Sequence, residues 1–337
     1  MQSIMLLAVD GGATKTLAVV FDGEISGVGV AGSGNYNNVG VEVAKSNAEK
    51  AVTDAMKMAG CGWESIEKAA YGFAGVENSA ATTMSVEQFL RSVHRNGQFS
   101  LFNDGVAAYY LSTKGRPGVV AAAGTGSVIQ ARGDGKAVRE GGWGWLAGDE
   151  GSAYYIARRG LQAATKAFDG RGEETSLVDA FARSAGMDFN AAIGQIYRNV
   201  SVTGIAALAP VVTSCASKGD ATALGICREA AKELALAVKT AKRRMEFNES
   251  FVIGGLGGVF RAGKVITDTF FAELVNEGGK FARIYYGYQV VLGSVLLHLK
   301  NTGVETDEGF TEKLVGQLDR GIAKLNGAVR KEFLFMD

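Results

Sequence analysis

The sequence has few of the residues on which several kinds of functional site depend. Its 337 residues include only three cysteines, two histidines and two prolines. The spacing of Cys61, Cys215 and Cys227 contains no C-x-x-C pair, which argues against a disulfide framework, a zinc site and a ligated iron–sulfur cluster. His94 and His298 both lie in stretches of helical pattern, so we expect the chemistry to depend on carboxylates.

An excess of charge and a long hydrophobic run are also missing. The 35 basic residues equal the 35 acidic ones, so nothing indicates a surface for nucleic acid or an anionic membrane. No apolar run reaches the length of a membrane span, and the first five residues contain no basic segment of the kind that begins a secretory signal. We therefore expect a cytoplasmic protein with a small-molecule partner and enough residues for two domains.

Glycine, by contrast, is abundant, and it divides the first apolar stretch in two. Residues 6–21 read LLAVDGGATKTLAVVF, which predicts a β-hairpin whose backbone N–H groups are bare at the bend. Such a bend can lie close to phosphate, and Asp10 is placed to hold a hydrated Mg²⁺ beside it. An ordinary surface hairpin with an Asx-type turn is the alternative.

The same pattern recurs later in the chain. Gly124 follows an apolar run as Gly12 does, and the pair Asp22-Gly23 recurs as Asp134-Gly135. Each copy predicts a meander of three antiparallel strands, so two copies indicate two similar domains that each offer a glycine bend to one ligand. Ala122 stands in the second copy where the first has Asp10, so a metal-associated acid is expected on one side only.

In a chain with only two prolines, the segment Gly115-Arg116-Pro117-Gly118 is the best candidate for a linker between domains. We predict an N-terminal domain over residues 1–115, which contains the first hairpin. The C-terminal domain is predicted over 116–300, and it contains the second glycine bend. An apolar stripe predicts a helix over 308–327 that packs back on the first domain.

One glycine pattern imitates a nucleotide-binding motif, and another such motif is missing from the glycine bends. Gly27-x-Gly29-x-x-Gly32 fits the dinucleotide fingerprint literally, but no helix opens at its end, so we reject it as a cofactor loop. Neither glycine bend matches the P-loop, because no Gly-Lys-Ser/Thr opens a helix. The segment 34–38 that follows is polar, and its amides are suited either to sugar hydroxyls or to turn formation.

Two acids stand out as candidates for chemistry. Asp104 follows a short predicted strand over 99–102, where α/β sheets place ligands, and it is either the general base of a phosphoryl transfer or a helix cap. Asp149 follows Trp143 and Trp145 in a glycine-rich segment, and it either contacts a sugar hydroxyl or caps the next helix. The tryptophans themselves are either core residues or part of a sugar site.

The remaining chain is mostly helical, with one further glycine-rich segment. Residues 175–247 have helical periodicity almost throughout. A strand over 251–253 then runs into Gly254–Gly258, where glycines allow the backbone to lie against a flat ring such as adenine. A helix over 267–276, a strand over 282–286 and a helix over 288–299 are expected after it.

The motifs VDGGATKT, FAG, NDG, AAGTGS, GGWGWLAGDEGSAYYIARRGL and FVIGGLGG, in that order over roughly residues 4–295, resemble the N-acetylglucosamine kinase family. Its relatives include archaeal ATP-dependent hexokinases, bacterial glucosamine kinases and some 2-keto-3-deoxygluconate kinases, within the actin, heat-shock-chaperone and sugar-kinase superfamily. The resemblance implies an α/β fold of two ribonuclease-H-like domains with mixed sheets and a ligand cleft between them. It is compatible with a homodimer. Iron–sulfur-dependent dehydratase activators share that fold, but the cysteine spacing here differs from theirs.

In function, the resemblance implies an ATP- and Mg²⁺-dependent sugar kinase. The γ-phosphate would pass to a hydroxyl, O6, of a hexose or amino sugar such as N-acetylglucosamine, glucosamine or glucose. A 2-keto-3-deoxygluconate kinase and a non-catalytic nucleotide or sugar sensor are the alternatives. Ala74 stands where the mammalian N-acetylglucosamine enzyme has a serine among its sugar contacts, so an N-acetyl preference is not implied.

The resemblance also implies roles for individual residues. Asp104 is implied as the base and Asp10 as the Mg²⁺-associated acid. The sugar-facing positions are Asn35, Gly75, Asp104, Thr125, Gly126 and Asp149. The ATP-binding positions are Gly11, Gly12, Thr14, Lys15, Gly124, Thr125, Gly126, Ser127, Gly255, Leu256 and Gly258.

Overall fold

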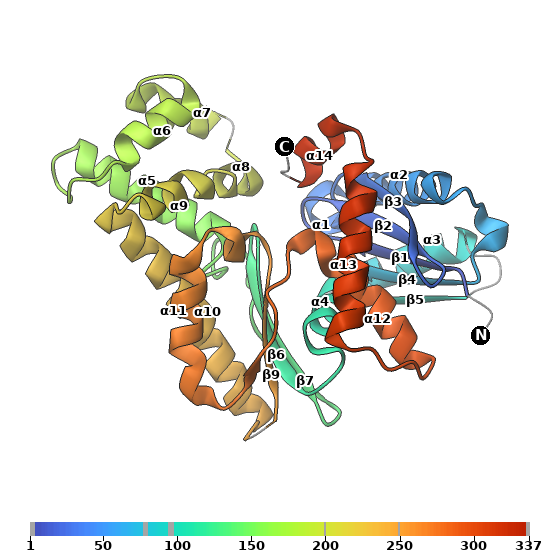
Figure 1. Ribbon diagram of the computed structural model, residues 1–337. Helices are drawn as coiled ribbons and strands as arrows, with labels where there is room; N and C mark the ends of the chain where they lie inside the picture. The colour runs from blue at the N-terminus through green and yellow to red at the C-terminus, as the bar shows by residue number, and fades with distance from the viewer. Residues whose placement is uncertain (1–3, 77–79, 94–97, 199, 249, 335–337) are drawn as a thin grey trace. The chain divides into compact units, whose positions relative to one another are not determined.

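The computed structural model describes residues 4–334 except 77–79, 94–97, 199 and 249, so His94 lies outside the described residues (Figure 1). The chain divides into two compact units, which we call the first and the second unit. The first comprises Met1–Gly115 and Tyr288–Asp337, and the second comprises Arg116–Gly287. Residues 288–300 therefore belong to the first unit and not to the predicted C-terminal domain.

A mixed five-stranded sheet forms the centre of the first unit, in the order β3-β2-β1-β4-β5. The first three strands are the predicted antiparallel meander, whereas β1, β4 and β5 run parallel. The strands are β1 (Leu6–Gly11), β2 (Thr16–Phe21), β3 (Ile25–Ala31), β4 (Lys68–Phe73) and β5 (Phe99–Asn103). The helices are α1 (Tyr36–Val39), α2 (Val41–Ala59), α3 (Ala80–Val93), α4 (Asp104–Thr113), α12 (Val291–Asn301), α13 (Glu308–Ala323) and α14 (Gly327–Leu334).

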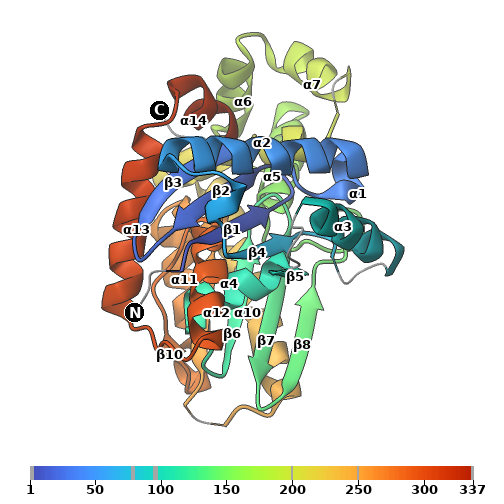
Figure 2. The same ribbon diagram turned by 90° about the vertical axis from the view of Figure 1, so that its right-hand side faces the viewer.

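Helix α2 covers one face of this sheet, over β2 and β3 (Figure 2). Its buried residues recur at helical spacing between Ala44 and Met56, and it ends before Gly60, which has the left-handed conformation. A Cβ on Gly27 would lie 2.0 Å from the backbone oxygen of Ala55, and one on Gly29 would lie 2.0 Å from that of Ala51. These glycines of the imitated dinucleotide motif therefore permit close packing of strand on helix.

The opposite face of the sheet is covered by α4 and α12. A Cβ on Gly293 of α12 would lie 1.8 Å from the backbone oxygen of Ala107 in α4, so the two helices cross at very close range. Helix α12 also contacts β1 and β4. This packing explains why residues after 287 belong to the first unit.

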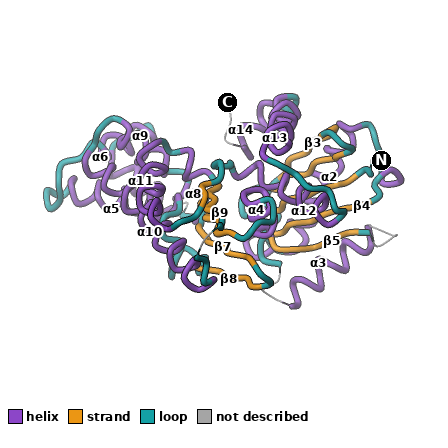
Figure 3. Tube along the Cα trace, turned by 60° about the horizontal axis from the view of Figure 1, so that its bottom comes forward, coloured by secondary structure: helices purple, strands orange, loops and turns teal. Residues whose placement is uncertain are grey.

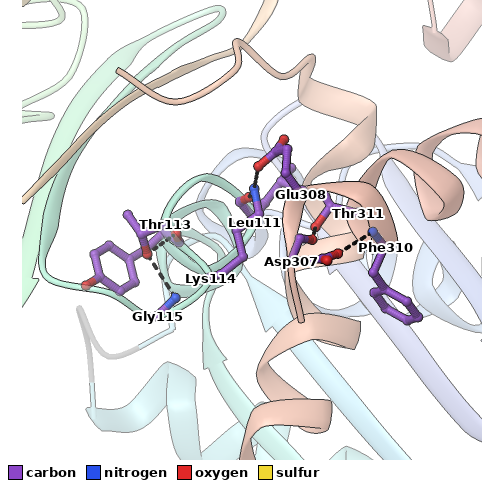
Figure 4. A network of polar contacts seen from close by, with 9 residues as sticks. Leu111, Thr113, Lys114, Gly115, Asp307, Glu308, Phe310 and Thr311 are labelled. Atoms are coloured by element: carbon purple, nitrogen blue, oxygen red, sulfur yellow. Dashed lines mark hydrogen bonds and ion pairs between the residues drawn. The ribbon is translucent and has the colours of Figure 1, made fainter. Parts of the chain in front are cut away.

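Helix α13 is joined to the end of α4 by a polar network within the first unit (Figure 4). The ammonium group of Lys114 lies 2.6 Å from Glu308 Oε2 and also donates to the backbone oxygen of Leu111 at 3.1 Å. Asp307 caps α13, since its Oδ1 accepts from the N–H of Phe310 at 2.7 Å. The Lys114 side chain is 6% exposed, and its ion pair joins the start of α13 to the end of α4.

The second unit has its own mixed five-stranded sheet, in the order β10-β9-β6-β7-β8. Strands β6, β7 and β8 form the predicted second meander, and β6, β9 and β10 are parallel. The strands are β6 (Gly118–Ala123), β7 (Ser127–Gly133), β8 (Lys136–Gly141), β9 (Val252–Leu256) and β10 (Lys280–Phe281). The predicted strand over 282–286 is wrong, because β10 ends at Phe281 and only an isolated bridge joins Leu256 to Tyr285.

Helices make up most of the second unit, and Figure 3 shows them grouped to one side of its strands. Helix α10 packs on β6, β7 and β8, and it contributes buried alanines and Leu234 to the core. The helices are α5 (Ala153–Phe168), α6 (Leu177–Ala185), α7 (Phe189–Arg198), α8 (Val202–Ala206), α9 (Ala209–Ser217), α10 (Ala221–Met245) and α11 (Lys264–Leu274). Among the helices that the structure describes, none has the length and apolar character to cross a membrane.

Candidate active-site residues

The parallel strands of the first unit end together and gather the predicted residues at one edge of the sheet. Asp10 pairs with Gly72 across β1 and β4, and Gly72 pairs with Phe102 across β4 and β5. The Cα of Asp104, directly after β5, lies 3.6 Å from the place that a Cβ on Gly72 would take. Gly75 follows β4 at the same edge, with φ of 90°. The two acids therefore belong to neighbouring strand ends, where sheets of this kind place ligands.

Asp10 is a buried acid with an unsatisfied oxygen. Its side chain is 6% exposed, and Oδ1 has no hydrogen-bond partner within the described part of the chain. Leu7 and Val9 point into the core beneath α2, so strand alternation turns Asp10 to the opposite face. Burial raises the pKa of the Asp10 carboxyl well above its usual value, the charge of Asp104 raises it further, and the charge of Lys15 lowers it.

This arrangement suits one kind of metal site and not another. Within the described residues there is no group of three His, Cys, Asp or Glu side chains that could hold a metal ion. Mg²⁺ commonly keeps several waters and is bound by one or two carboxylates together with substrate phosphates. A buried carboxylate oxygen without a partner fits that second kind, since a hydrated cation would supply the contact that the chain does not.

Asp104 is the first residue of α4, and its neighbour performs the capping. Asn103 is the N-cap, and its Oδ1 accepts from the N–H of Gly105 at 3.0 Å, while its amide donates to the backbone oxygen of Val76 at 3.0 Å. Asp104 Oδ1 shares the same N–H of Gly105, at 2.9 Å. The alternative that Asp104 is the cap of this helix is therefore wrong, because the helix begins one residue earlier than that reading requires.

The first hairpin is closed on itself and carries the polar segment after β3. The N–H of Gly12 donates to Lys15 O at 2.9 Å, so at this residue the expected bare bend is wrong. Gly34 N donates to Gly12 O at 3.1 Å, and Asn35 N donates to Ser33 Oγ at 3.2 Å. These bonds place Asn35 beside the hairpin.

Gly11 and Thr14 complete the predicted positions of this hairpin. Gly11 is buried, and a Cβ there would lie 2.1 Å from Cδ1 of Phe73. Its carbonyl accepts from Ala74 N at 2.8 Å, which ties the end of β1 to the turn before Gly75. Thr14 is half-buried on the loop.

The glycine turn of the second unit is bonded to the start of α5. Gly124 N donates to Gly126 O at 2.9 Å and closes the turn between β6 and β7. Ala153 N donates to Gly124 O at 2.8 Å, and Tyr154 N donates to Thr125 O at 3.3 Å. The first N–H groups of α5 are thus satisfied by the loop itself.

Asp149 lies directly against this turn. Its carboxylate accepts from the backbone N–H groups of Ser127 and Gly144, and a Cβ on Gly126 would lie 2.6 Å from its Oδ2. Burial raises the pKa of the Asp149 carboxyl, and these two hydrogen bonds oppose the rise. Ser152 is the cap of α5, since its Oγ accepts from Tyr155 N at 3.1 Å, so the capping alternative for Asp149 is wrong.

Ser127 and the two tryptophans fall in different environments around Asp149. Ser127 Oγ is buried and donates to Glu150 O at 2.6 Å. Trp143 is 78% exposed and Trp145 is 46% exposed, so the interpretation of these rings as core residues is wrong.

The predicted adenosine loop is mostly a strand. Gly255 and Leu256 are buried in β9, and Gly255 O accepts from Tyr285 N at 3.1 Å. Gly258 is exposed at the start of a 3-10 turn, with no atom within 4 Å of the place of a Cβ. A Cβ on Gly257 would lie 2.2 Å from Ala123 O, so this turn lies against the end of β6. Gly258 alone of the three offers open backbone.

Two residues that the sequence reasoning did not select belong to the edge that holds Asp10 and Asp104. Asn103 caps α4, and the sequence signal that indicates this role is an Asn directly before Asp104. Tyr36 is 6% exposed, and its hydroxyl has no hydrogen-bond partner among the residues that the structure describes. Burial raises the pKa of the Tyr36 phenol, and the charge of Asp104 raises it further. No pattern of the sequence indicates that this phenol is unpaired.

Comparison with known proteins gives one family and several kinases. Residues 7–298 match the family described as the BadF/BadG/BcrA/BcrD ATPase family. The chain is 31% identical over 274 residues to the N-acetylmuramic acid/N-acetylglucosamine kinase of Clostridium acetobutylicum, covering 79% of this chain and 88% of that protein. It is 28% identical over 193 residues to the N-acetyl-D-glucosamine kinase of Dictyostelium discoideum, covering 53% of this chain and 59% of that protein.

Solved structures give the same picture of the fold. A Chromobacterium violaceum protein assigned as an N-acetylglucosamine kinase superposes with a TM-score of 0.70 at 25% identity, covering 88% of this chain and 99% of that one. The ROK family glucokinase of Streptomyces griseus, in complex with glucose and AMPPNP, superposes with a TM-score of 0.55 at 16% identity, covering 88% and 99%. The predicted α/β fold with two mixed sheets is confirmed.

Proposed function

Since this chain belongs to the BadF/BadG/BcrA/BcrD ATPase family, we propose that it transfers the γ-phosphate of ATP to a hydroxyl of a hexose or amino sugar. The enzyme class is that of an ATP-dependent sugar kinase, given the kinases to which most of the chain is similar. The finer proposal is that the acceptor is O6. The names of the relatives favour an N-acetylated amino sugar, with glucosamine and glucose as further candidates.

One observation carries the proposal: two carboxylates at neighbouring strand ends have different environments. Asp10 is buried, and its Oδ1 is unpaired among the described residues, whereas Asp104 is half-buried on the first turn of α4 and is not needed as its cap. We assign Asp104 as the base. It would align the sugar hydroxyl and accept its proton as the oxygen–phosphorus bond forms and ADP leaves.

Asp10 is the residue proposed to hold Mg²⁺ with the phosphates of ATP. When bound there, the cation would neutralise charge on the phosphates. Lys15 lies near enough to lower the pKa of Asp10, and a lysine on this hairpin is suited to a phosphate oxygen. Gly11, Gly12 and Thr14 are proposed as the further ATP-binding positions of the first unit, and Asn35 and Gly75 as its sugar-facing positions.

In the second unit, the turn from Gly124 to Ser127 is proposed to bind phosphate oxygens through its backbone. Thr125, Gly126 and Asp149 are proposed to face the sugar, because the Asp149 carboxylate lies directly against Gly126. Gly258 is proposed to face the nucleoside, with Gly255 and Leu256 as its support in β9.

A coupled assay of ADP release tests the proposal. It is run with ATP and Mg²⁺ over glucose, mannose, glucosamine, N-acetylglucosamine and 2-keto-3-deoxygluconate. Sugar-stimulated turnover, with a sugar 6-phosphate identified by mass spectrometry, is the expected result. Turnover with 2-keto-3-deoxygluconate alone would replace the hexose proposal, and tight sugar binding without any phosphorylated product would indicate a sensor instead. ATP turnover that no sugar stimulates would contradict it.

A further inference from the structure

The Tyr36 side chain carries a buried hydroxyl. The side chain is 6% exposed, and among the described residues its hydroxyl has no hydrogen-bond partner. The backbone oxygen of Tyr36 accepts from Gly40 N at the end of α1, so the backbone of this residue is hydrogen-bonded. A buried hydroxyl without a partner destabilises the folded protein, so a phenylalanine would be the more stable residue unless the hydroxyl has another role.

Tyr36 begins α1 shortly after the end of β3, which lies level with the end of β1 at the edge of the sheet that gathers the two acids. Its ring packs on that of Phe73, with 6.0 Å between the centroids and 52° between the planes. The Phe73 ring in turn lies against Gly11, directly after Asp10. The charge of Asp104 acts on the phenol and disfavours its ionisation, so the hydroxyl remains a donor.

The chemistry of these neighbours selects the ligand that the hydroxyl can bind. A phosphate group in direct contact with the Asp104 carboxylate would be repelled, and a cation has no need of an O–H donor. A sugar hydroxyl is both donor and acceptor, so it can accept from the phenol while it, or the next hydroxyl on the ring, donates to Asp104.

We infer that Tyr36 determines sugar specificity: its hydroxyl donates a hydrogen bond to a ring hydroxyl next to the one that Asp104 activates. The inference rests on the proposed function for the identity of the ligand. In this account the unpaired phenol of the free protein is satisfied only when the correct sugar is bound. A sugar without that hydroxyl leaves the phenol buried and unpaired, which is how such sites reject analogues.

The variant Tyr36→Phe tests the inference because it keeps the ring on Phe73 and removes only the hydroxyl. Tyr71→Phe is the matched control, since the ring of Tyr71 also stacks on that of Phe73, with 5.9 Å between centroids, and burial alone raises the pKa of its phenol, with no contribution from Asp104. For each protein, KM and the calorimetric Kd are measured with N-acetylglucosamine and its 3-deoxy and 4-deoxy analogues. The unfolding midpoint and the KM for ATP are measured in parallel.

We expect Tyr36→Phe to weaken binding of N-acetylglucosamine by about 10- to 100-fold, as loss of one hydrogen bond to a substrate hydroxyl does. Its unfolding midpoint should be equal to or above that of the wild type, and its KM for ATP should be unchanged. One deoxy analogue should bind wild type and variant equally, and the missing hydroxyl then identifies the contact. Tyr71→Phe should leave all sugar constants unchanged.

The outcomes separate this inference from the proposed function. Sugar turnover by wild type, with sugar constants of Tyr36→Phe within about threefold and a lower unfolding midpoint, would overturn the inference and leave the kinase proposal standing. Sugar binding that Tyr36→Phe weakens, in a wild type without turnover, would overturn the kinase proposal and support the inference. A wild type that binds none of the three sugars would overturn the inference as well.

Discussion

Replacing Asp10 by asparagine is predicted to stabilise the free protein while it removes activity. The carboxylate is buried, one oxygen has no partner, and the nearby charge of Asp104 opposes ionisation. Asparagine has nearly the same size but no charge, so it removes the cost of the buried ion. A buried and unsatisfied polar group costs about 1–3 kcal/mol, more for a charged one, so the expected gain at pH 8 is about 1–3 kcal/mol.

The gain should depend on pH in a direction that the raised pKa of Asp10 determines. In the folded protein this pKa lies above that of the unfolded chain, about 3.9, so between the two values the folded state binds more protons. Stability from Asp10 is therefore fully present below the unfolded pKa and is lost as pH rises through the folded pKa. The asparagine variant does not titrate, so its advantage should be small at pH 4 and largest at pH 8.

Scanning calorimetry at pH 4, 6 and 8 measures this difference, and each kcal/mol should shift the midpoint by about 2–4 °C for domains of this size. Asp54→Asn, at an exposed ion pair with Lys50 on α2, is the control, with an expected change within about 0.5 kcal/mol. An Asp10→Asn variant that is less stable than wild type by the same amount at every pH would refute the reasoning. It would mean that the folded protein holds the charged carboxylate favourably.

Four further substitutions follow from local geometry. Asn103→Ala should lower the free energy of unfolding by about 1 kcal/mol, measured by urea titration, because it removes the cap of α4. Gly126→Ala should raise the KM for sugar by at least about tenfold, since the new methyl would lie 2.6 Å from Asp149 Oδ2. At Gly124, where a Cβ meets no atom within 4 Å, alanine should preserve the unfolding midpoint. An unfolding midpoint that is lower for Gly124→Ala than for Gly126→Ala would contradict this geometry. Gly29→Ala should cost about 1–3 kcal/mol of stability, seen as a lower urea midpoint, because the methyl would meet the backbone of α2.

The elements were largely predictable because local pattern determines them. Both three-stranded meanders follow from alternating apolar runs and glycine or Asp-Gly turns, and α2 follows from its apolar period and Gly60. The strand over 282–286 was wrong because a short apolar run does not reveal how many residues pair with a neighbour. Only Lys280–Phe281 pairs continuously with β9.

The positions of the candidate site residues could be predicted from the sequence, but the hydrogen bonds that these residues make could not. Asp104 and Asp149 were each weighed as helix caps, and in each case another residue, Asn103 or Ser152, performs that role. Which of several adjacent polar residues caps a helix depends on where the backbone enters the helical conformation, and sequence pattern defines that only to within a few residues. The unpaired hydroxyl of Tyr36 depends on contacts between segments far apart in the chain, so no local pattern could indicate it.

The turnover number of Asp104→Asn, at saturating ATP, Mg²⁺ and sugar, tests the central claim most directly. Asparagine retains an acceptor for the N–H of Gly105 but cannot take the proton of the sugar hydroxyl. The account predicts that kcat falls by about 10²- to 10⁴-fold while the unfolding midpoint is retained. A kcat within about tenfold of wild type, equivalent to about 1.4 kcal/mol in the barrier, would contradict the assignment of Asp104 as the base.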